Sequence, residues 1–166
     1  MSWLDLSPVD ALRRNHAVEH ATMHILARRH PYLNAVARTD LDGFNVYGQV
    51  DTKTLADTAA EALGRLQNGE SDLAVHPRCG TNLAVSGLLA GVGTFVAMGR
   101  SKPRLSRLPS FILAATIAVL VAQPLGLIVQ KHITTSPHVE GLAIKQVTRR
   151  EIAGLIVHKV ELEQAC

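Results

Sequence analysis

Two long apolar segments constrain the fold of this chain more than any other feature. Residues 81–99 (TNLAVSGLLAGVGTFVAMG) and residues 108–130 (LPSFILAATIAVLVAQPLGLIVQ) contain 19 and 23 residues without a charged side chain. Because a helix rises 1.5 Å per residue, about 20 residues cross the roughly 30 Å hydrocarbon core of a bilayer. The two segments therefore predict a transmembrane helical hairpin. The alternative is a pair of buried helices in a soluble core, but 166 residues leave little other chain to surround them.

The charges around these segments predict a cell-membrane protein and give conflicting signals about its orientation. The loop between the segments contains a basic cluster, Arg100, Lys102, Arg104 and Arg107. By the positive-inside rule this loop would be cytoplasmic and both flanking regions would lie outside. The flanking regions are also basic, and no signal peptide is recognisable at the start of the sequence. We therefore expect a multi-pass protein with two transmembrane helices and cytoplasmic polar regions. The net charge of +3 is too small and scattered to indicate nucleic acid, so the expected partners are the lipid bilayer, a peptide or membrane-protein substrate and a second copy of the chain.

The polar regions predict an α+β fold: a small helix/strand domain with a two-helix transmembrane hairpin inserted before the C-terminal strands. A first helix is expected to begin near Ser7 and Pro8 and to end near His30, because Pro31 follows. A second helix is predicted over residues 52–67. The expected strands are residues 34–38, 44–50, 72–75, 139–147 and 155–162, with the last two joined around residues 149–151.

These elements give three predicted regions. Residues 1–80 form a metal-binding α/β region, residues 81–130 form the transmembrane hairpin, and residues 131–166 supply C-terminal strands that complete the α/β region.

The first predicted helix contains an H-x-x-E-H motif, formed by His16, Glu19 and His20. Residues four apart lie on the same face of a helix, so the two imidazoles can bind one ion, typically Zn²⁺ at about 2.0–2.1 Å. Glu19 directly precedes His20 and can act as the catalytic general base on a metal-bound water, as in the inverted H-E-x-x-H motif of inverzincin metalloproteases. The open alternative is a polar helix face with a paired histidine and glutamate.

A second motif, HPRCGTN, places His76 and Cys79 three residues apart just before the first apolar segment. Two potential ligands on a turn, facing two on a helix, commonly assemble a tetrahedral zinc site. A lone cysteine is otherwise a small buried hydrophobe. The other cysteine is Cys166, so the chain can form at most one disulfide. We predict that His16, His20, His76 and Cys79 bind zinc.

Three further residues are expected beside the ion, where they support the ligands or contact a substrate. His24 is eight residues from His16, about 12 Å along a helix axis, which is too far for both to bind one ion directly. Arg78 and Asn82 flank Cys79 in the second motif and could stabilise an oxyanion.

The two motifs together resemble an uncharacterised bacterial membrane-protein family whose sequences read approximately H-G-A-E-H-K, then H-P-R-C-G-T-S, then an apolar run. The corresponding stretches here are H-A-V-E-H-A at residues 16–21 and H-P-R-C-G-T-N at residues 76–82, and TTSP at residues 134–137 is similar to that family's post-membrane region. The resemblance implies a metal-binding membrane protein and no particular reaction. Ala21 replaces the lysine of the family pattern, so a role for a positive charge there has no support.

The sequence leaves three functions open. In the first, a membrane-bound zinc metallopeptidase uses the open position on zinc to activate water for peptide-bond hydrolysis, with Glu19 as the base. In the second, a membrane scaffold or accessory protein holds zinc in a closed structural site, because His16, His20, His76 and Cys79 all bind it. In the third, the histidines bind a metal transiently during transport or cofactor handling.

Overall fold

The computed structural model describes residues 7–99 and 105–164, and the chain separates into two units. The first unit combines Met1–His76 with Lys131–Cys166, and the second is Pro77–Gln130. Most of the predicted basic loop, including Arg100, Lys102 and Arg104, lies outside the described residues, as does Cys166. The α+β class and the two apolar helices before the C-terminal strands are confirmed.

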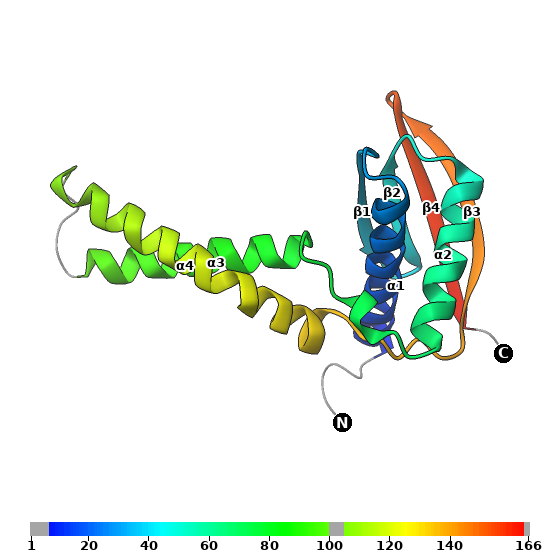
Figure 1. Cartoon of the computed structure of the whole chain (residues 1–166), viewed down its shortest axis with the longest axis horizontal. Coiled ribbons are helices and arrows are strands. Elements are labelled where there is room, and N and C mark those ends of the chain that lie inside the picture. The colour runs from blue at the N-terminus through cyan, green and yellow to red at the C-terminus, as the bar shows by residue number, and fades with distance from the viewer. Residues whose placement is uncertain (1–6, 100–104, 165–166) are drawn as a thin grey trace. The chain divides into compact units, whose positions relative to one another are not determined.

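In the first unit, the order helix, strand, strand occurs twice along the chain (Figure 1). The elements are α1 (Ser7–Arg29), β1 (Ala35–Asp40), β2 (Gly43–Gly48), α2 (Thr52–Gln67), a short 3₁₀ helix η2 (Ser71–Ala74), β3 (Leu142–Ile152) and β4 (Leu155–Gln164). Residues 77–130 are inserted between the second helix and its two strands. The fold is therefore completed only by chain that follows the insertion.

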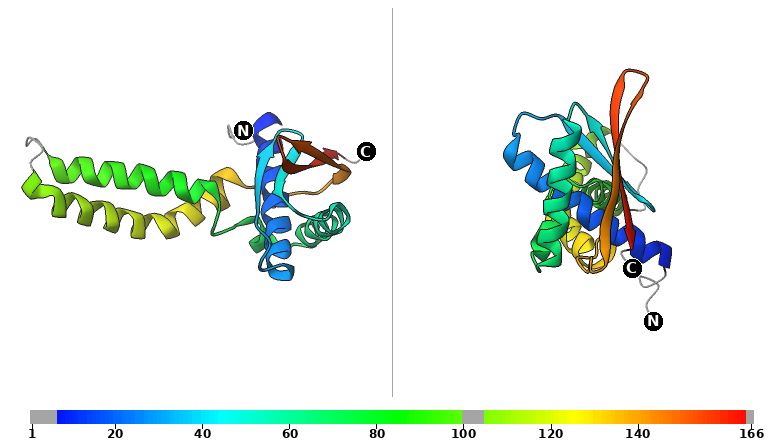
Figure 2. Two further views of the ribbon diagram at one scale, coloured as in Figure 1. Left: turned by 90° about the horizontal axis from the view of Figure 1, so that it is seen from above. Right: turned by 90° about the vertical axis from the view of Figure 1, so that its right-hand side faces the viewer.

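The four strands form one antiparallel sheet in the order β1-β2-β4-β3, and both helices pack on the same face of it (Figure 2). In the central pair, Phe44 lies opposite Val160 and Val46 opposite His158, and all four side chains are buried. Helix α1 contacts β1 and β2, whereas α2 contacts β3 and β4. The core consequently lies between the sheet and the two helices, where the period-two face of the strands meets the apolar stripe of each helix.

Helix α2 shows how the sequence determines one of these elements. The Asp51 side chain accepts a hydrogen bond of 2.7 Å from the backbone N–H of Thr54, which satisfies one of the unpaired donors at the helix start. One face of the helix is buried, and it consists of Leu55, Thr58, Ala59, Ala62, Leu63 and Leu66. The predicted helix over residues 52–67 is confirmed at both ends.

Two local predictions are wrong. Residues 72–75 were expected to form a strand, but the chain forms the 3₁₀ helix η2 there, because Leu73 and Ala74 are both buried and a strand would point them to opposite faces. The turn between the C-terminal strands lies at Ala153 and Gly154 rather than at residues 149–151. Both turn residues have positive φ, as a tight type I′ hairpin requires, and alanine seldom signals this conformation.

The second unit is a helical hairpin. Helix α3 (Gly80–Met98) and helix α4 (Leu108–Val129) pack against each other, with a short 3₁₀ turn η3 (Leu105–Arg107) before α4 and a π-helical turn η4 (Gln130–Thr134) after it. The spans Gly80–Met98 and Leu108–Thr134 are long and apolar enough to cross a membrane by length and composition.

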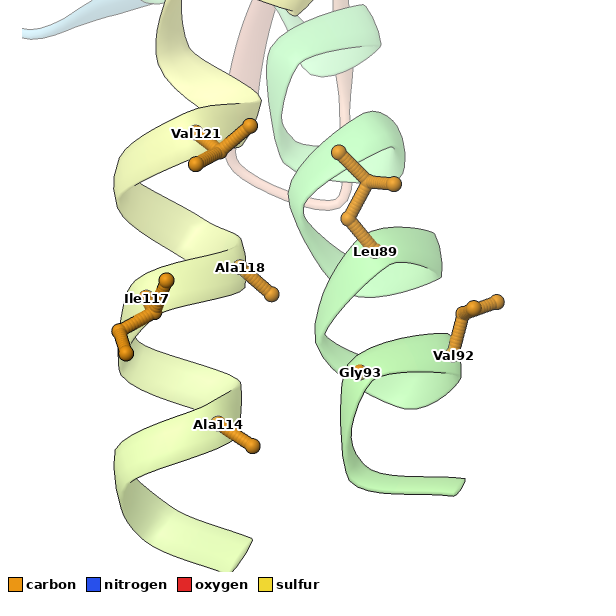
Figure 3. A pocket seen from close by; sticks show the side chains of 7 residues that line it. All are labelled: Leu89, Val92, Gly93, Ala114, Ile117, Ala118 and Val121. Atoms are coloured by element: carbon orange, nitrogen blue, oxygen red, sulfur yellow. The ribbon is translucent and has the colours of Figure 1, made fainter. Parts of the chain in front are cut away.

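Small residues bring α3 and α4 close together. Gly93 faces Ala114 and Ala118, and a Cβ atom at Gly93 would lie 3.2 Å from the Cβ of Ala118 (Figure 3). Near the other end of the hairpin, a Cβ atom at Gly126 would overlap the Asn82 side chain. Such small-residue contacts let helix backbones approach closely where water is absent.

Candidate metal site

Four histidine rings form a continuous group in the first unit, which we call the histidine cluster: His16, His20, His24 and His76. The first three occupy successive turns of one face of α1, as the spacing of four predicts. The ring centroids of His16 and His20 are 4.2 Å apart, and the ring of His76 lies 5.8 Å from that of His20 and 4.7 Å from that of His24. The structure thus brings together three of the four predicted ligands and the predicted neighbour His24.

Backbone carbonyls orient the rings of His16 and His20 and determine which nitrogen of each ring carries the proton. His16 Nδ1 lies 2.9 Å from the carbonyl oxygen of Thr134, and His20 Nδ1 lies 2.7 Å from that of Ala74. Because a carbonyl oxygen only accepts hydrogen bonds, each Nδ1 carries the proton and donates it. In the neutral ring the lone pair is then on Nε2, which is the arrangement typical of metal-binding histidines.

The Nε2 atom of His20 is buried and has no hydrogen-bond partner among residues 7–99 and 105–164. An unsatisfied buried acceptor costs about 1–3 kcal/mol, so such atoms usually have a ligand, water or ion as partner. Because the Ala74 carbonyl binds the proton on Nδ1, Nε2 of the neutral ring is an acceptor, and a bound cation would satisfy it. The donor set of the cluster therefore fits a transition-metal ion.

The loop after α2 holds His76 beside α1. Leu73 and Ala74 of η2 are buried, η2 packs on α1, and the Ala74 carbonyl binds His20. His76 follows only two residues later, so the contact that orients His20 also restricts the position of the His76 ring. The sequence predicted a turn at the HPRC motif, but the preceding 3₁₀ helix had been expected to be a strand.

The remaining predicted ligand, Cys79, belongs to the second unit and precedes α3, where its Sγ accepts a hydrogen bond of 3.4 Å from the Thr81 N–H. Three residues of chain span at most about 11 Å, which keeps Cys79 near His76 in any arrangement of the units. Imidazole nitrogen and thiolate sulfur are the ligands that zinc prefers. Cys79 as a ligand beside the helix histidines stays a prediction.

Glu19 lies on the sheet side of α1. Its side chain is 7% exposed, and its carboxylate accepts a hydrogen bond from the hydroxyl of Thr39 on β1. One turn earlier, the amide of Asn15 donates to the carbonyls of Asp40 and Leu41 at 3.0 Å each. These contacts make a polar seam between α1 and the β1–β2 hairpin, and the role of Glu19 as a general base stays a prediction.

The other predicted neighbours of the ion have different surroundings. Asn82 is buried, donates to the carbonyl of Pro77 at 2.8 Å and accepts from Gln130 Nε2 at 2.6 Å, so its amide joins the two ends of the hairpin. Arg78 is exposed. Burial lowers the pKa of His24, and the nearby His20 and Arg28 lower it further, which favours the neutral ring.

Sequence reasoning missed the groups that orient the histidines. The carbonyls of Ala74 and Thr134 come from segments 54 and 118 residues away from the rings they bind. Backbone carbonyls have no side-chain signature, so no sequence pattern indicates them. Arg13 also binds the segment after α4, because its Nη2 donates to the carbonyl of Thr135 at 3.2 Å.

Comparison with known proteins places this chain in a family. The model of the family described as "Domain of unknown function (DUF6391)" matches residues 11–147. An uncharacterized protein of Picosynechococcus sp. is 38% identical over 135 residues, a region that covers 75% of this chain and 66% of the relative, just under two thirds of its length. No solved structure matches.

The matched residues extend from α1 into β3 and include the histidine cluster and both apolar helices. Membership of a family of unknown function is thereby confirmed, whereas the motifs ascribed to that family and a zinc-binding role for the helix stay predictions. This chain belongs to the DUF6391 family.

Proposed function

We propose that this protein is a membrane protein that binds one transition-metal ion, with zinc as the expected ion, through Nε2 of His16 and His20. The observation that carries the proposal is the buried Nε2 of His20, which has no hydrogen-bond partner among the described residues while its Nδ1 is fixed by Ala74. His16 has the same polarity, since Thr134 binds its Nδ1. Two pre-oriented lone pairs one helical turn apart are a typical half of a zinc site.

Cys79 and His76 are the proposed remaining ligands. Together with the two helix histidines they make a Cys-His₃ donor set, which suits a tetrahedral zinc ion. A site with all four ligands is closed, so it leaves no position on the ion for a reactive water. Structural zinc sites of this kind contribute directly to folding free energy.

We favour this closed, structural site over a metallopeptidase because of the environment of Glu19. General-base catalysis requires the carboxylate to contact a metal-bound water. The carboxylate instead binds the Thr39 hydroxyl within the seam between α1 and β1. Hydrolysis would therefore require Glu19 to act through its second oxygen from the sheet side of α1, and no other feature of the described residues favours peptide cleavage.

The direct test is metal analysis of the full-length protein purified in detergent micelles. We expect about one zinc ion per chain, and we expect His20→Ala to remove it, because the buried Nε2 is lost. His30→Ala is the matched control: His30 is an exposed histidine at the end of the same helix, and its loss should leave the metal content unchanged. A wild-type protein without stoichiometric metal would refute the proposal.

A Glu19→Gln variant separates the structural site from the peptidase. Glutamine can still accept a hydrogen bond from Thr39 but cannot act as a base, so a structural site should keep its zinc and its function. Peptide hydrolysis by the wild type that disappears in Glu19→Gln, with zinc retained, would show that the site is catalytic instead.

A further inference from the structure

We propose that His24 and His76 form a second, transient site for the same class of ion, through which the ion passes from solvent to His16 and His20. This inference rests on the proposed function, because it assigns an entry route to the same metal site. It concerns the two rings of the histidine cluster that lie farthest toward the C-terminal end of α1.

The ring contacts lead from two partly exposed rings, His24 and His76, to the buried ring of His20. The rings of His24 and His76 are 4.7 Å apart, and both side chains are partly exposed. The next contact, from His76 to His20, joins rings 5.8 Å apart, and His20 is only 2% exposed. Beyond His20 the group continues to His16, whose ring is 4.2 Å away and which is itself partly exposed.

The positions of these rings are determined by backbone elements rather than by long flexible side chains. His24 follows His20 by one turn on α1, so the two project from the same helix face. His76 is held next to that face by η2, because Ala74, two residues earlier, binds His20 Nδ1. The His24–His76 pair is therefore built next to the proposed zinc ligands with little freedom to separate from them.

The chemistry of the transfer is ligand exchange. A hydrated divalent ion loses water as it binds the imidazoles of His24 and His76. A bond from the metal to an Nε2 atom of His20 or His16 then forms as the bond to His24 breaks, and no electron is transferred. Two imidazoles give a weaker site than four ligands, so the ion moves on to the complete site.

The test measures the rate of zinc loading separately from the affinity. Metal-free full-length protein in detergent micelles is mixed with Zn²⁺ in a stopped-flow instrument, and the free ion is followed with a chromophoric chelator. We compare the wild type with His24→Leu, which removes the metal-binding nitrogens at similar volume, with His24→Cys, which restores a metal ligand, and with His30→Leu as an exposed control directly after α1.

We expect His24→Leu to slow loading several-fold while the final stoichiometry and dissociation constant stay the same, and we expect His24→Cys to recover the rate. An unchanged loading rate in His24→Leu would overturn the inference, and so would a loss of affinity, which would make His24 a ligand of the final site. Far-UV circular dichroism checks folding, with His24→Gln as the replacement if the leucine variant is misfolded. Failure of the proposed function is distinct, because the wild type would then bind no zinc.

Discussion

The two units of this protein use apolar side chains in opposite ways. In the first unit, α2 buries one stripe against the sheet and exposes a polar face. In the second unit, α3 and α4 contact each other but leave most of their apolar side chains exposed, including Leu88 at 68% and Phe95 at 72%. A helix that is apolar on all sides suits an apolar solvent, and α3 and α4 are long and apolar enough to cross a membrane, whereas α2 has the one-sided apolar stripe of a helix that packs on a core.

Two phenylalanines provide the largest expected contrast between the units. Phe44 is fully buried in the sheet, whereas Phe95 is mostly exposed on α3. Phe44→Ala should lower the free energy of unfolding of the first unit by about 3–5 kcal/mol, because it leaves a cavity in the core. Phe95→Ala should change it by less than about 0.5 kcal/mol. Urea unfolding in micelles, followed by hydrogen exchange of the sheet amides, measures both, and equal effects would contradict the division between the units.

A charge placed at two equally exposed positions sharpens the comparison. Leu88 near the middle of α3 is 68% exposed, and Val36 on β1 is 69% exposed. If α3 spans a bilayer, Leu88→Arg should disfavour insertion by about 2.5–3.5 kcal/mol. Val36→Arg should have an effect within about 0.5 kcal/mol, because its side chain is in water. Alkaline extraction of membranes reports the integrated fraction, and a fully integrated Leu88→Arg protein would show that α3 does not cross the lipid.

The smallest expected effect is a pH dependence that belongs to the first unit alone. His158 is buried on β4, and its Nε2 lies 3.0 Å from the Thr52 hydroxyl. Burial lowers the pKa of His158 below 6.5 and Arg149 lowers it further, while Asp51 opposes them. The unfolded chain therefore binds the proton first, so this contribution to stability is complete above pH 6.5 and is lost as the pH falls below that value.

The matched variant is His158→Gln, which keeps a side-chain amide near Thr52 and does not titrate. The difference in unfolding free energy between wild type and variant should change between about pH 7 and pH 5. The contributions of all other titrating groups are the same in both proteins, so they cancel in this difference. A constant difference over that interval would mean that His158 has an ordinary pKa in the folded protein.

Much of this architecture was predictable from local patterns. The helix over residues 52–67 has an N-cap, an apolar stripe and a stop, all of which act within a few residues. The apolar helices are equally plain, since their composition alone identifies them. The η2 segment was not predictable, because its geometry depends on the packing of Leu73 and Ala74 against α1. The turn at Ala153 was missed because alanine gives no signal for positive φ.

The candidate site was predictable to a similar extent. The i, i+4 spacing placed His16 and His20 on one face, and the HPRC motif indicated that His76 joins them. The position of Glu19 was harder to foresee, because adjacent helix residues point about 100° apart and only the sheet determines which partner each one meets. Spacing therefore predicted which residues gather but not which groups orient them.

The carbonyls that orient the two principal imidazoles belong to the points where the chain leaves and re-enters the first unit. Ala74 precedes the departure at residue 77, and Thr134 follows the return after residue 130. Two histidines one turn apart on α1 therefore bind both the segment that leaves the first unit and the segment that returns to it. A shortened protein in which residues 77–130 are replaced by a linker must keep both carbonyls in place, or the rings lose their orientation even though every histidine is still present.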